Sequence, residues 1–192
     1  MASLLRPALG LLFAFSVLTG LAYPALVTVL AQAFFSGQAH GSLIADGDQV
    51  RGSTLIGQPF ADPGHFWSRP SATAPAYNAA ASTGSNLGPM NPALSDAVKA
   101  RIEALRAADP GNTAPVPIDL VTTSGSGLDP HITPAAALYQ VPRVARARGI
   151  SEQKLRELVQ AHVEGRTFAI LGEPRVNVLQ LNLDLERAAK GG

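Results

Sequence analysis

The feature that most constrains this chain is an uncharged apolar segment near its N-terminus. No Asp, Glu, Lys or Arg occurs from residue 7 to residue 45, and Leu, Ala, Val and Phe dominate residues 9–30. At about 1.5 Å per residue, a helix of this length crosses roughly 30 Å of hydrocarbon. We therefore predict a transmembrane anchor over residues 1–35, with its helix at about residues 9–30, and a single folded domain over residues 36–192.

Charges on either side of the apolar segment predict its orientation. Arg6 and the amino terminus precede it, whereas Asp46 and Asp48 follow it. Because basic residues favour the cytoplasmic side, we expect a cytoplasmic N-terminus and a main domain outside the membrane. A cleaved signal peptide is the alternative, with Ala31-Gln32-Ala33 as its cleavage site, although signal peptides have a shorter apolar region of about 7–15 residues.

The composition excludes several kinds of site. The chain has no cysteine, so it forms no disulfide, thiol nucleophile or cysteine-based metal site. Its 15 basic and 14 acidic residues give a net charge of +1, which is too nearly neutral to drive nucleic-acid binding. No His-x-His or His-x-x-x-His pair occurs, so we expect surface or capping roles rather than metal ligation for the four histidines. These are His40, His65, His131 and His162.

Periodicity and cap residues predict a mixed α+β domain. Three helices are expected, one from Asn91-Pro92 to residues 109–111, one from Thr133-Pro134 toward Gly149, and one from Ser151 to Gly165. Pro142 predicts a kink or an early break in the second helix. Residues 59–92 predict an extended ordered loop, because a flexible linker has little use for the four aromatic residues that this stretch contains. They are Phe60, Phe66, Trp67 and Tyr77.

Strands are expected on both sides of these helices. Residues 44–56 indicate one or two short strands, and residues 116–122 and 167–171 one each. From Leu179 to Leu185, leucine alternates with polar residues, which predicts a strand with one buried face. The two preceding valines are in the opposite phase, so we expect a β-bulge near Val178 or Leu179.

A loop rich in glycine and serine follows residue 123. It reads Ser124-Gly125-Ser126-Gly127-Leu128-Asp129-Pro130-His131, and its hydroxyls, carboxylate and imidazole suggest a nucleophilic hydrolase. Against this, the four groups lie within eight residues on one loop, and no Gly-x-Ser-x-Gly elbow is present. An anion-binding nest is a second interpretation, but the P-loop pattern is absent and no lysine lies between Lys99 and Lys154.

Other distinctive blocks flank this loop, and together they resemble a known family. The blocks are Gly52-Ser53-Thr54-Leu55-Ile56-Gly57-Gln58, Phe66-Trp67-Ser68-Arg69-Pro70-Ser71-Ala72, Gly84-Ser85-Asn86-Leu87-Gly88-Pro89-Met90-Asn91-Pro92, the 116–123 and 131–149 flanks of the loop, and Val176-Asn177-Val178-Leu179-Gln180-Leu181-Asn182-Leu183. In this order they resemble the KdpC family, the C subunit of the bacterial Kdp potassium-transporting P-type ATPase. The resemblance covers nearly the whole chain.

The resemblance implies an accessory subunit of a high-affinity potassium uptake complex. It implies a single-pass protein of the bacterial inner membrane with its main domain in the periplasm. Its partners would be a channel-like potassium-binding subunit, a catalytic P-type ATPase subunit and a small membrane subunit. The chain lacks the Asp-Lys-Thr-Gly-Thr phosphorylation signature, so we expect no catalytic residue of its own. The alternatives are a membrane-anchored periplasmic hydrolase and a binding module that uses the Ser-Gly loop.

The resemblance also implies a candidate nucleotide site. The family is proposed to act as a catalytic chaperone that raises the ATP affinity of the catalytic subunit, through a Ser-Gly stretch and a following glutamine. Here these are Ser124, Gly125, Ser126, Gly127 and Gln140. The predicted orientation conflicts with this role, because ATP is cytoplasmic. A turn that satisfies its own hydrogen bonds beside a subunit interface is the structural interpretation of the same loop.

Two further groups of charged residues are candidates for weaker roles. Asp119 and Asp129 suggest attraction of cations toward a channel mouth, and structural roles are the alternative. Arg143, Arg146 and Arg148 come late in the second predicted helix, where cations favour the negative end of the helix dipole. Contact with an acidic partner is the alternative for this arginine group.

Overall fold

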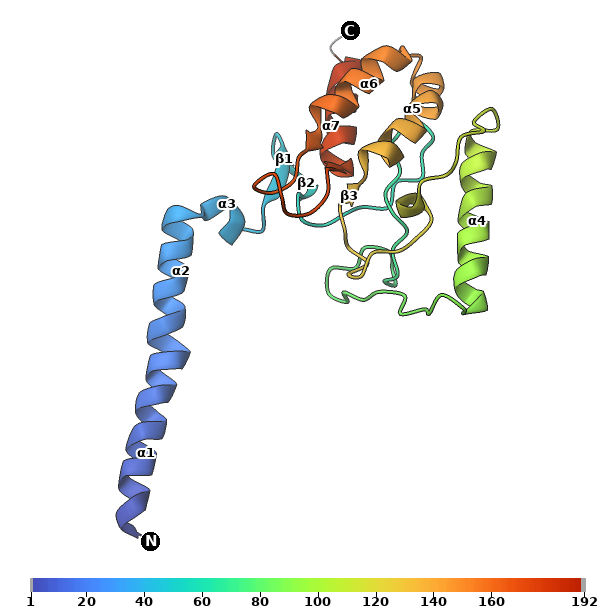
Figure 1. Cartoon of the computed structure of the whole chain (residues 1–192). Helices are drawn as coiled ribbons and strands as arrows, with labels where there is room; N and C mark the ends of the chain where they lie inside the picture. The colour runs from blue at the N-terminus through green and yellow to red at the C-terminus, as the bar shows by residue number, and fades with distance from the viewer. Residues whose placement is uncertain (1, 191–192) are drawn as a thin grey trace. The chain divides into compact units, whose positions relative to one another are not determined.

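The computed structural model describes residues 2–190 and divides them into two compact units (Figure 1). The first unit ends at Arg51 and the second begins at Gly52. The first contains the apolar helix, and the second contains a small sheet with four helices of ten residues or more. Together they make a mixed α+β chain with an N-terminal helix, as predicted.

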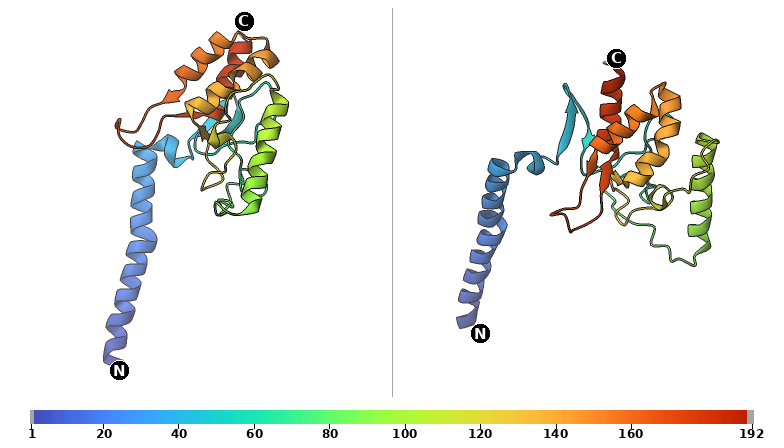
Figure 2. Two further views of the ribbon diagram at one scale, coloured as in Figure 1. Left: turned by 45° about the vertical axis from the view of Figure 1, so that its right-hand side comes forward. Right: turned by 45° about the horizontal axis from the view of Figure 1, so that its top comes forward.

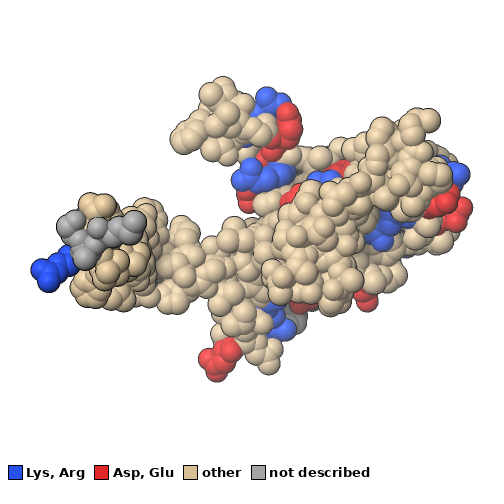
Figure 3. All heavy atoms as spheres, turned by 90° about the horizontal axis from the view of Figure 1, so that it is seen from below, with Lys and Arg blue, Asp and Glu red and all other residues tan. Residues whose placement is uncertain are grey.

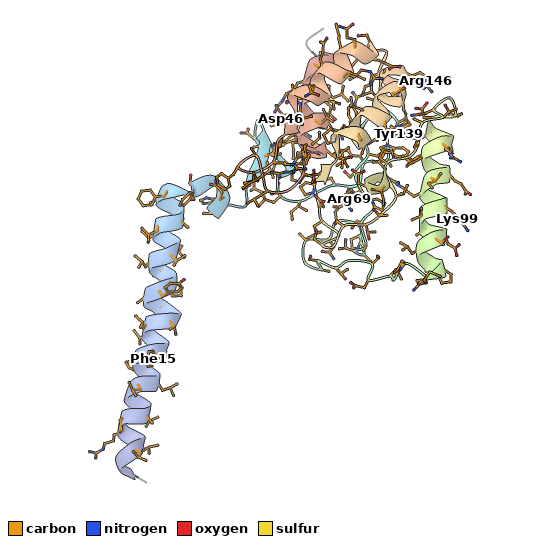
Figure 4. The ribbon with its side chains drawn as sticks, in the orientation of Figure 1. Phe15, Asp46, Arg69, Lys99, Tyr139 and Arg146 are labelled. Carbon is orange, nitrogen blue, oxygen red and sulfur yellow. The ribbon has the colours of Figure 1, made fainter. Side chains whose placement is uncertain are left out.

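The first unit is dominated by one continuous helical rod. It comprises α1 (Ala2–Val17), a π-helical turn η1 (Leu18–Ala22) and α2 (Tyr23–Phe34). Residues Leu4–Phe34 are apolar and long enough to cross a membrane, and the side chains of this window are not buried within the chain. Figure 4 shows Phe15 pointing outward from the rod. The helix is thus longer at both ends than the predicted residues 9–30.

The π-helical turn accommodates a proline inside the rod. Pro24 has no backbone N–H, and its ring would meet the carbonyl of Gly20 in a regular α-helix. Gly20 lies within the π-helical turn, where the wider hydrogen-bond spacing changes this geometry. The rod then continues to Phe34, and is followed by α3 (Ser36–Ala39) and a hairpin of β1 (Leu43–Asp46) and β2 (Gln49–Ser53). The hairpin confirms the short strands expected between residues 44 and 56.

The second unit is built on an antiparallel sheet ordered β3-β5-β4. Its strands are β3 (His131–Ile132), β4 (Val163–Glu164) and β5 (Arg175–Asn177). In the central strand, Val176 lies opposite Ile132 on one side and Val163 on the other. Residues that are distant in the sequence therefore meet at one short strand.

Four helices surround or flank this sheet. They are α4 (Pro92–Ala108), α5 (Pro134–Arg148), α6 (Glu152–Ala161) and α7 (Val178–Lys190). Figures 1 and 2 show α5, α6 and α7 together, with α4 running along one side of the unit. The core is formed mainly where α5, α6 and α7 meet the sheet, from apolar residues that are almost completely buried. Among them are Val141, Val144, Leu155, Val159, Leu181 and Leu185.

Cap residues explain where the predicted helices begin. The side chains of Asn91, Thr133 and Ser151 each accept a hydrogen bond from a backbone N–H in the first turn of α4, α5 and α6. Gly149 ends α5 in the left-handed conformation, at φ +66°. The starts of all three helices are confirmed. The early break at Pro142 is wrong, because α5 continues through it to Arg148.

The long segment before α4 is ordered without regular structure, as predicted. Its aromatic residues pack on the second unit: Phe66 and Trp67 are buried, and Phe60 packs against the core. The Tyr77 hydroxyl donates to the backbone oxygen of Arg69 (2.6 Å). This segment therefore belongs to the folded unit.

Two predicted strands, at residues 116–122 and 167–171, are wrong. Residues Ile118–Leu120 form the 3₁₀ helix η2, after Pro117, and bury Leu120. Residues 167–171 form the turn of the β4–β5 hairpin, in which Thr167 and Leu171 make a single bridge. Phe168 and Ala169 have φ of +54° and +64°, which a regular strand does not allow.

The predicted strand over Leu179–Leu185, with its bulge, is also wrong, because this stretch belongs to α7. Val178, Leu181, Asn182 and Leu185 are buried, whereas Leu183 is half-buried. Val178, Leu181, Asn182 and Leu185 follow i, i+3, i+4 and i+7, the spacing of one helix face, and Leu179 beside Val178 is also buried. The polar Asn182 obscured this pattern, and the alternating leucines imitated a strand.

Candidate functional site

The Ser-Gly loop folds back on itself through its two serines. The Gly127 N–H donates to Ser124 Oγ (2.9 Å), and the Leu128 N–H donates to Ser126 Oγ (3.1 Å). Ser124 is buried, while Gly125 and Ser126 are exposed. Each serine hydroxyl thus closes a short turn, as capping side chains do.

The same loop is attached to the irregular segment that precedes α4. Ser126 O accepts from the Thr83 N–H (3.0 Å) and from Ser82 Oγ (3.1 Å). Ser71 Oγ donates to Gly127 O (2.6 Å). Gly127 has φ +68°, and a Cβ there would lie 2.5 Å from Thr83 O. Glycine is therefore needed at this position for both conformation and space.

Gln140 lies elsewhere, on the buried face of α5, and its amide is fully engaged by protein groups. Its Oε1 accepts from the Trp67 N–H (2.7 Å) and from Arg143 (2.6 Å). Its Nε2 donates to Trp67 O (3.1 Å) and Ala136 O (3.3 Å). None of the contacts described for this side chain is with residues 124–127. Gln140 and the Ser-Gly loop, the two parts of the predicted nucleotide site, therefore bond to different groups of residues.

Asn182 on α7 repeats the arrangement at the adjacent residue. The Phe66 N–H donates to Asn182 Oδ1 (2.8 Å), and Asn182 Nδ2 donates to Phe66 O (2.9 Å). The two side-chain amides therefore bond to the N–H and C=O groups of two consecutive residues, Phe66 and Trp67. They replace the backbone partners that a neighbouring β-strand would provide. This satisfies the polar backbone groups of an extended segment that passes through the core. No local sequence pattern indicates this role of Asn182, because its partner Phe66 lies 116 residues away in the chain.

Two arginine side chains also bind the backbone of the segment around Phe66 and Trp67. Arg143 donates to the backbone oxygens of Pro63 and His65, and its guanidinium lies 4.3 Å from the centroid of the Trp67 ring. Arg101 on α4 lies 5.3 Å from the same ring and donates to Ser68 O. Burial lowers the pKa of Arg143 to about 10, so it stays cationic at neutral pH. Both arginines make cation–π contacts.

The other late arginines of α5 also bind within the unit. Arg146 pairs with the buried Asp109 (2.6 Å), and Arg148 donates to Gly64 O (2.7 Å). Figure 4 shows Tyr139 and Arg146 on α5. Because Arg143 is buried, these arginines connect loops to α5 instead of forming one exposed patch. On the face shown in Figure 3, acidic and basic side chains are interspersed.

Asp129 and Asp119 each have local partners. Asp129 pairs with Arg69 (3.1 Å) and accepts from the His131 N–H (3.0 Å). Burial acts to raise the pKa of Asp129, but hydrogen bonds from His131 and the charge of Arg69 outweigh it, so that the pKa lies below its usual value. Asp119 accepts from the Thr133 N–H (2.6 Å). Both carboxylates are therefore accounted for structurally.

A small hollow of about 170 Å³ is lined by Arg69, Asp119, Asp129 and His131, together with Glu173 and Arg175. The Nε atoms of Arg69 and Arg175 are buried there without a hydrogen-bond partner. Three carboxylates share the hollow with two guanidinium groups and the His131 imidazole, so groups of opposite charge are interspersed there and pair with one another. Among the described residues, the structure contains no cluster of three or more histidine, aspartate or glutamate side chains that could hold a metal ion.

The histidines make separate contacts. His65 lies near Glu186 (3.0 Å), and His162 bridges Leu158 O (2.9 Å) and Asp184 (2.9 Å). His40 contacts Ser36 O, and His131 lies next to Asp129. His40 and His162 are the C-cap residues of α3 and α6, as a capping role predicts, whereas His65 and His131 are half-buried beside carboxylates and do not lie on the open surface.

Comparison with known proteins identifies the family. The family model described as "KdpC: K+-transporting ATPase, c chain" matches residues 5–187. The chain belongs to the KdpC family. Two relatives named potassium-transporting ATPase KdpC subunit come from Herpetosiphon aurantiacus, 62% identical over 97% of both chains, and Sorangium cellulosum, 64% identical over 96% of this chain and 97% of the relative. A third, from Methylococcus capsulatus, is 63% identical over 94% of this chain and 96% of the relative.

Family membership confirms the resemblance inferred from the sequence blocks. The KdpC match extends through the apolar helix and the second unit, up to Arg187 in α7. The Ser-Gly loop and the buried amide pairs both lie within the matched residues.

Proposed function

We propose that this chain is an accessory subunit of a potassium-transporting P-type ATPase complex in the bacterial inner membrane. One helix anchors it, and the second unit lies on the periplasmic side and stabilises the assembly. Its partners are a channel-like subunit, the catalytic ATPase subunit and a small membrane subunit. The observation that carries this proposal is the KdpC match over nearly the full chain, together with an exposed apolar helix over Leu4–Phe34.

The periplasmic orientation is supported by charges at the ends of the helix. Arg6 precedes the uncharged stretch, and Asp46 and Asp48 follow it. A basic residue on the N-terminal side favours a cytoplasmic N-terminus. With this orientation the Ser-Gly loop has no access to cytoplasmic ATP.

A structural role for the Ser-Gly loop is supported by its hydrogen bonds. Ser124 and Ser126 close their own turns, and Gly127 is packed against Thr83. The hydroxyls of Ser124 and Ser126 bond to each other and to backbone N–H groups, and His131 is paired with Asp129, which disfavours the hydrolase alternative. ATP binding through Ser124, Gly125, Ser126, Gly127 and Gln140 stays a prediction of the resemblance.

Functional replacement in a bacterium that lacks its own KdpC tests the proposed role. The full chain is expressed with the other Kdp subunits, and we expect growth on limiting potassium and co-purification with the complex. Co-purification without growth would show that the chain assembles but does not support transport. Failure of both, with the chain present in the membrane, would contradict the proposal.

Cysteine labelling in intact cells tests the orientation separately. The chain contains no cysteine, so Ser126→Cys introduces a single probe at an exposed position. We expect labelling from outside by a membrane-impermeant maleimide, while the matched Leu4→Cys variant labels only after the cells are opened. The reverse pattern would place the loop in the cytoplasm and favour the nucleotide role.

A further inference from the structure

The β4–β5 hairpin ends in an exposed apolar tip. Phe168 is 85% exposed, Ile170 74% and Leu171 56%. Among the described residues of the second unit, the other large exposed apolar side chains stand singly along the sequence. They are Leu55, Met90 and Ile118. Clustered exposed apolar side chains mark contact with a membrane or another protein, whereas single ones need no explanation.

Ion pairs below the tip define where the apolar surface stops. Arg166 pairs with Glu173 (2.7 Å), and Arg175 pairs with Glu164 (2.9 Å). All four charged residues lie on the stem, and residues 167–172 between them contain none. The hairpin therefore changes from charged to apolar over a few residues. Figure 2 shows this loop projecting from the body of the second unit.

The backbone of the tip is strained in a way that glycine would relieve. Phe168 and Ala169 both have positive φ, at +54° and +64°. Left-handed backbone is unfavourable for residues with a side chain, and especially for a bulky one. A phenylalanine at such a position contributes nothing to the core, since it is exposed. The combination points to a use for the aromatic side chain outside the domain.

We propose that the tip, residues 168–171, inserts into the interfacial layer of the bilayer that holds the chain's own apolar helix. This rests on the proposed membrane anchoring. Only residues 35–51 connect the helix to the second unit, so the domain stays near the membrane surface. Tethering raises the effective concentration of the tip at that surface, so that a few apolar side chains suffice for binding.

The shape of the tip favours lipid over a partner protein as the occupant. The tip is a projecting loop, and a bilayer accepts a projecting apolar group without a preformed pocket. Aromatic and aliphatic side chains partition into the boundary between headgroups and acyl chains, while paired charges remain among the headgroups. The ion pairs on the stem thus set the depth of insertion.

Fluorescence quenching by lipids tests the proposal with the full chain in liposomes. Ile170→Cys is labelled with an environment-sensitive dye, because this exposed side chain is not part of the core. Ile118→Cys is the matched control, since Ile118 is 73% exposed on a different element. We expect a blue shift and loss of emission with shallow quencher lipids at position 170, and neither at position 118.

A third probe separates failure of this inference from failure of the anchor. Leu12→Cys lies within the proposed span and is expected to be quenched by deep quencher lipids. Quenching at position 12 without quenching at position 170 would overturn tip insertion and leave the anchor intact. Absence of quenching at position 12 would overturn both. A shift at position 170 that requires the other Kdp subunits would instead assign the tip to a protein partner, and would also overturn the proposal.

Discussion

At the scale of single residues, polar groups in the core of the second unit serve the backbone. Gln140 and Asn182 pair with Trp67 and Phe66, so an extended segment crosses the core with its N–H and C=O groups satisfied. An unpaired buried backbone group costs about 1–3 kcal/mol. Gln140, the glutamine that the family resemblance associates with nucleotide, therefore has a structural role: its amide satisfies the backbone N–H and C=O of Trp67.

Replacement of Gln140 by alanine should destabilise the second unit whether or not nucleotide is present. Because the change leaves the Trp67 N–H and C=O unpaired and opens a cavity, we expect a loss of about 2–4 kcal/mol. The chain has one tryptophan, Trp67, and it is buried, so its fluorescence during urea unfolding in detergent reports on this unit.

Gln153→Ala is the matched control, because Gln153 is exposed on α6 and should change stability by less than about 0.5 kcal/mol. Equal effects of the two substitutions would show that the amide pairing does not stabilise the fold.

At the scale of elements, α7 shows how two periodicities can overlap. Leucines at 179, 181, 183 and 185 alternate as in a strand, but the helix buries Leu181 and Leu185 with Asn182 and leaves Leu183 half-buried. The strand β5 ends at Asn177, whose side chain accepts from the Gln180 N–H (3.1 Å) and so caps the new helix. Val176 therefore lies in the strand and Val178 in the helix, with Asn177 at the junction between them.

Leu181 and Leu183 distinguish the helix from the strand by experiment. A strand would place both on one face, with similar costs of truncation. In α7, Leu181 is 0% exposed, so Leu181→Ala should cost about 2–5 kcal/mol. Leu183→Ala should cost about 1 kcal/mol or less. Urea unfolding followed by Trp67 fluorescence measures both, and comparable losses would contradict the helical assignment.

Two glycines of the Ser-Gly loop, Gly127 and Gly125, make a matched pair for testing how the loop packs, because an added Cβ would be crowded at Gly127 and free of neighbours at Gly125. Gly127→Ala places a methyl group against Thr83 O in left-handed backbone, and we expect a loss of about 1–3 kcal/mol. Gly125 has no neighbour within 4 Å of an added Cβ. Gly125→Ala should therefore leave stability between unchanged and about 1 kcal/mol higher. If both variants fold equally well under thermal unfolding, the loop is not held against the 71–84 segment.

At the scale of the whole molecule, the apolar helix determines where this protein works. The helical stretch of 31 residues over Leu4–Phe34 is about 46 Å long, which exceeds the roughly 30 Å of bilayer hydrocarbon. A span of this length suits a retained anchor better than a signal peptide, whose apolar region is much shorter. Retention also keeps the second unit beside the membrane, as the proposed subunit role requires.

The mass of the mature chain tests retention of the helix. We expect intact-mass measurement of the membrane-extracted protein to give about 19.9 kDa, the mass of the full chain, apart from processing of the initiator methionine. The same protein should resist extraction by alkaline carbonate. A mature chain that begins after Ala33 and is found in the soluble fraction would mean export without an anchor.

Local signals determined the parts of this protein that the sequence alone predicts. An uncharged apolar run produces a helix that is long and apolar enough to span a bilayer. Asn91, Thr133 and Ser151 start helices because capping depends on adjacent residues. The family blocks likewise lie in the sequence itself.

Tertiary structure alone decided the rest. Gln140 and Asn182 pair with the distant residues Trp67 and Phe66, which no spacing rule connects. Leu179–Leu185 became a helix because its burial against α6 and β5 outweighed the alternating pattern. Residues 167–171 became a turn, and Phe168 was left exposed at its tip. The 167–171 turn is held by hydrogen bonds within the hairpin itself, which the sequence pattern did not indicate. For the amide pairs and α7, the free energy depends on contacts between segments far apart in the chain, and local propensity is too weak to override them.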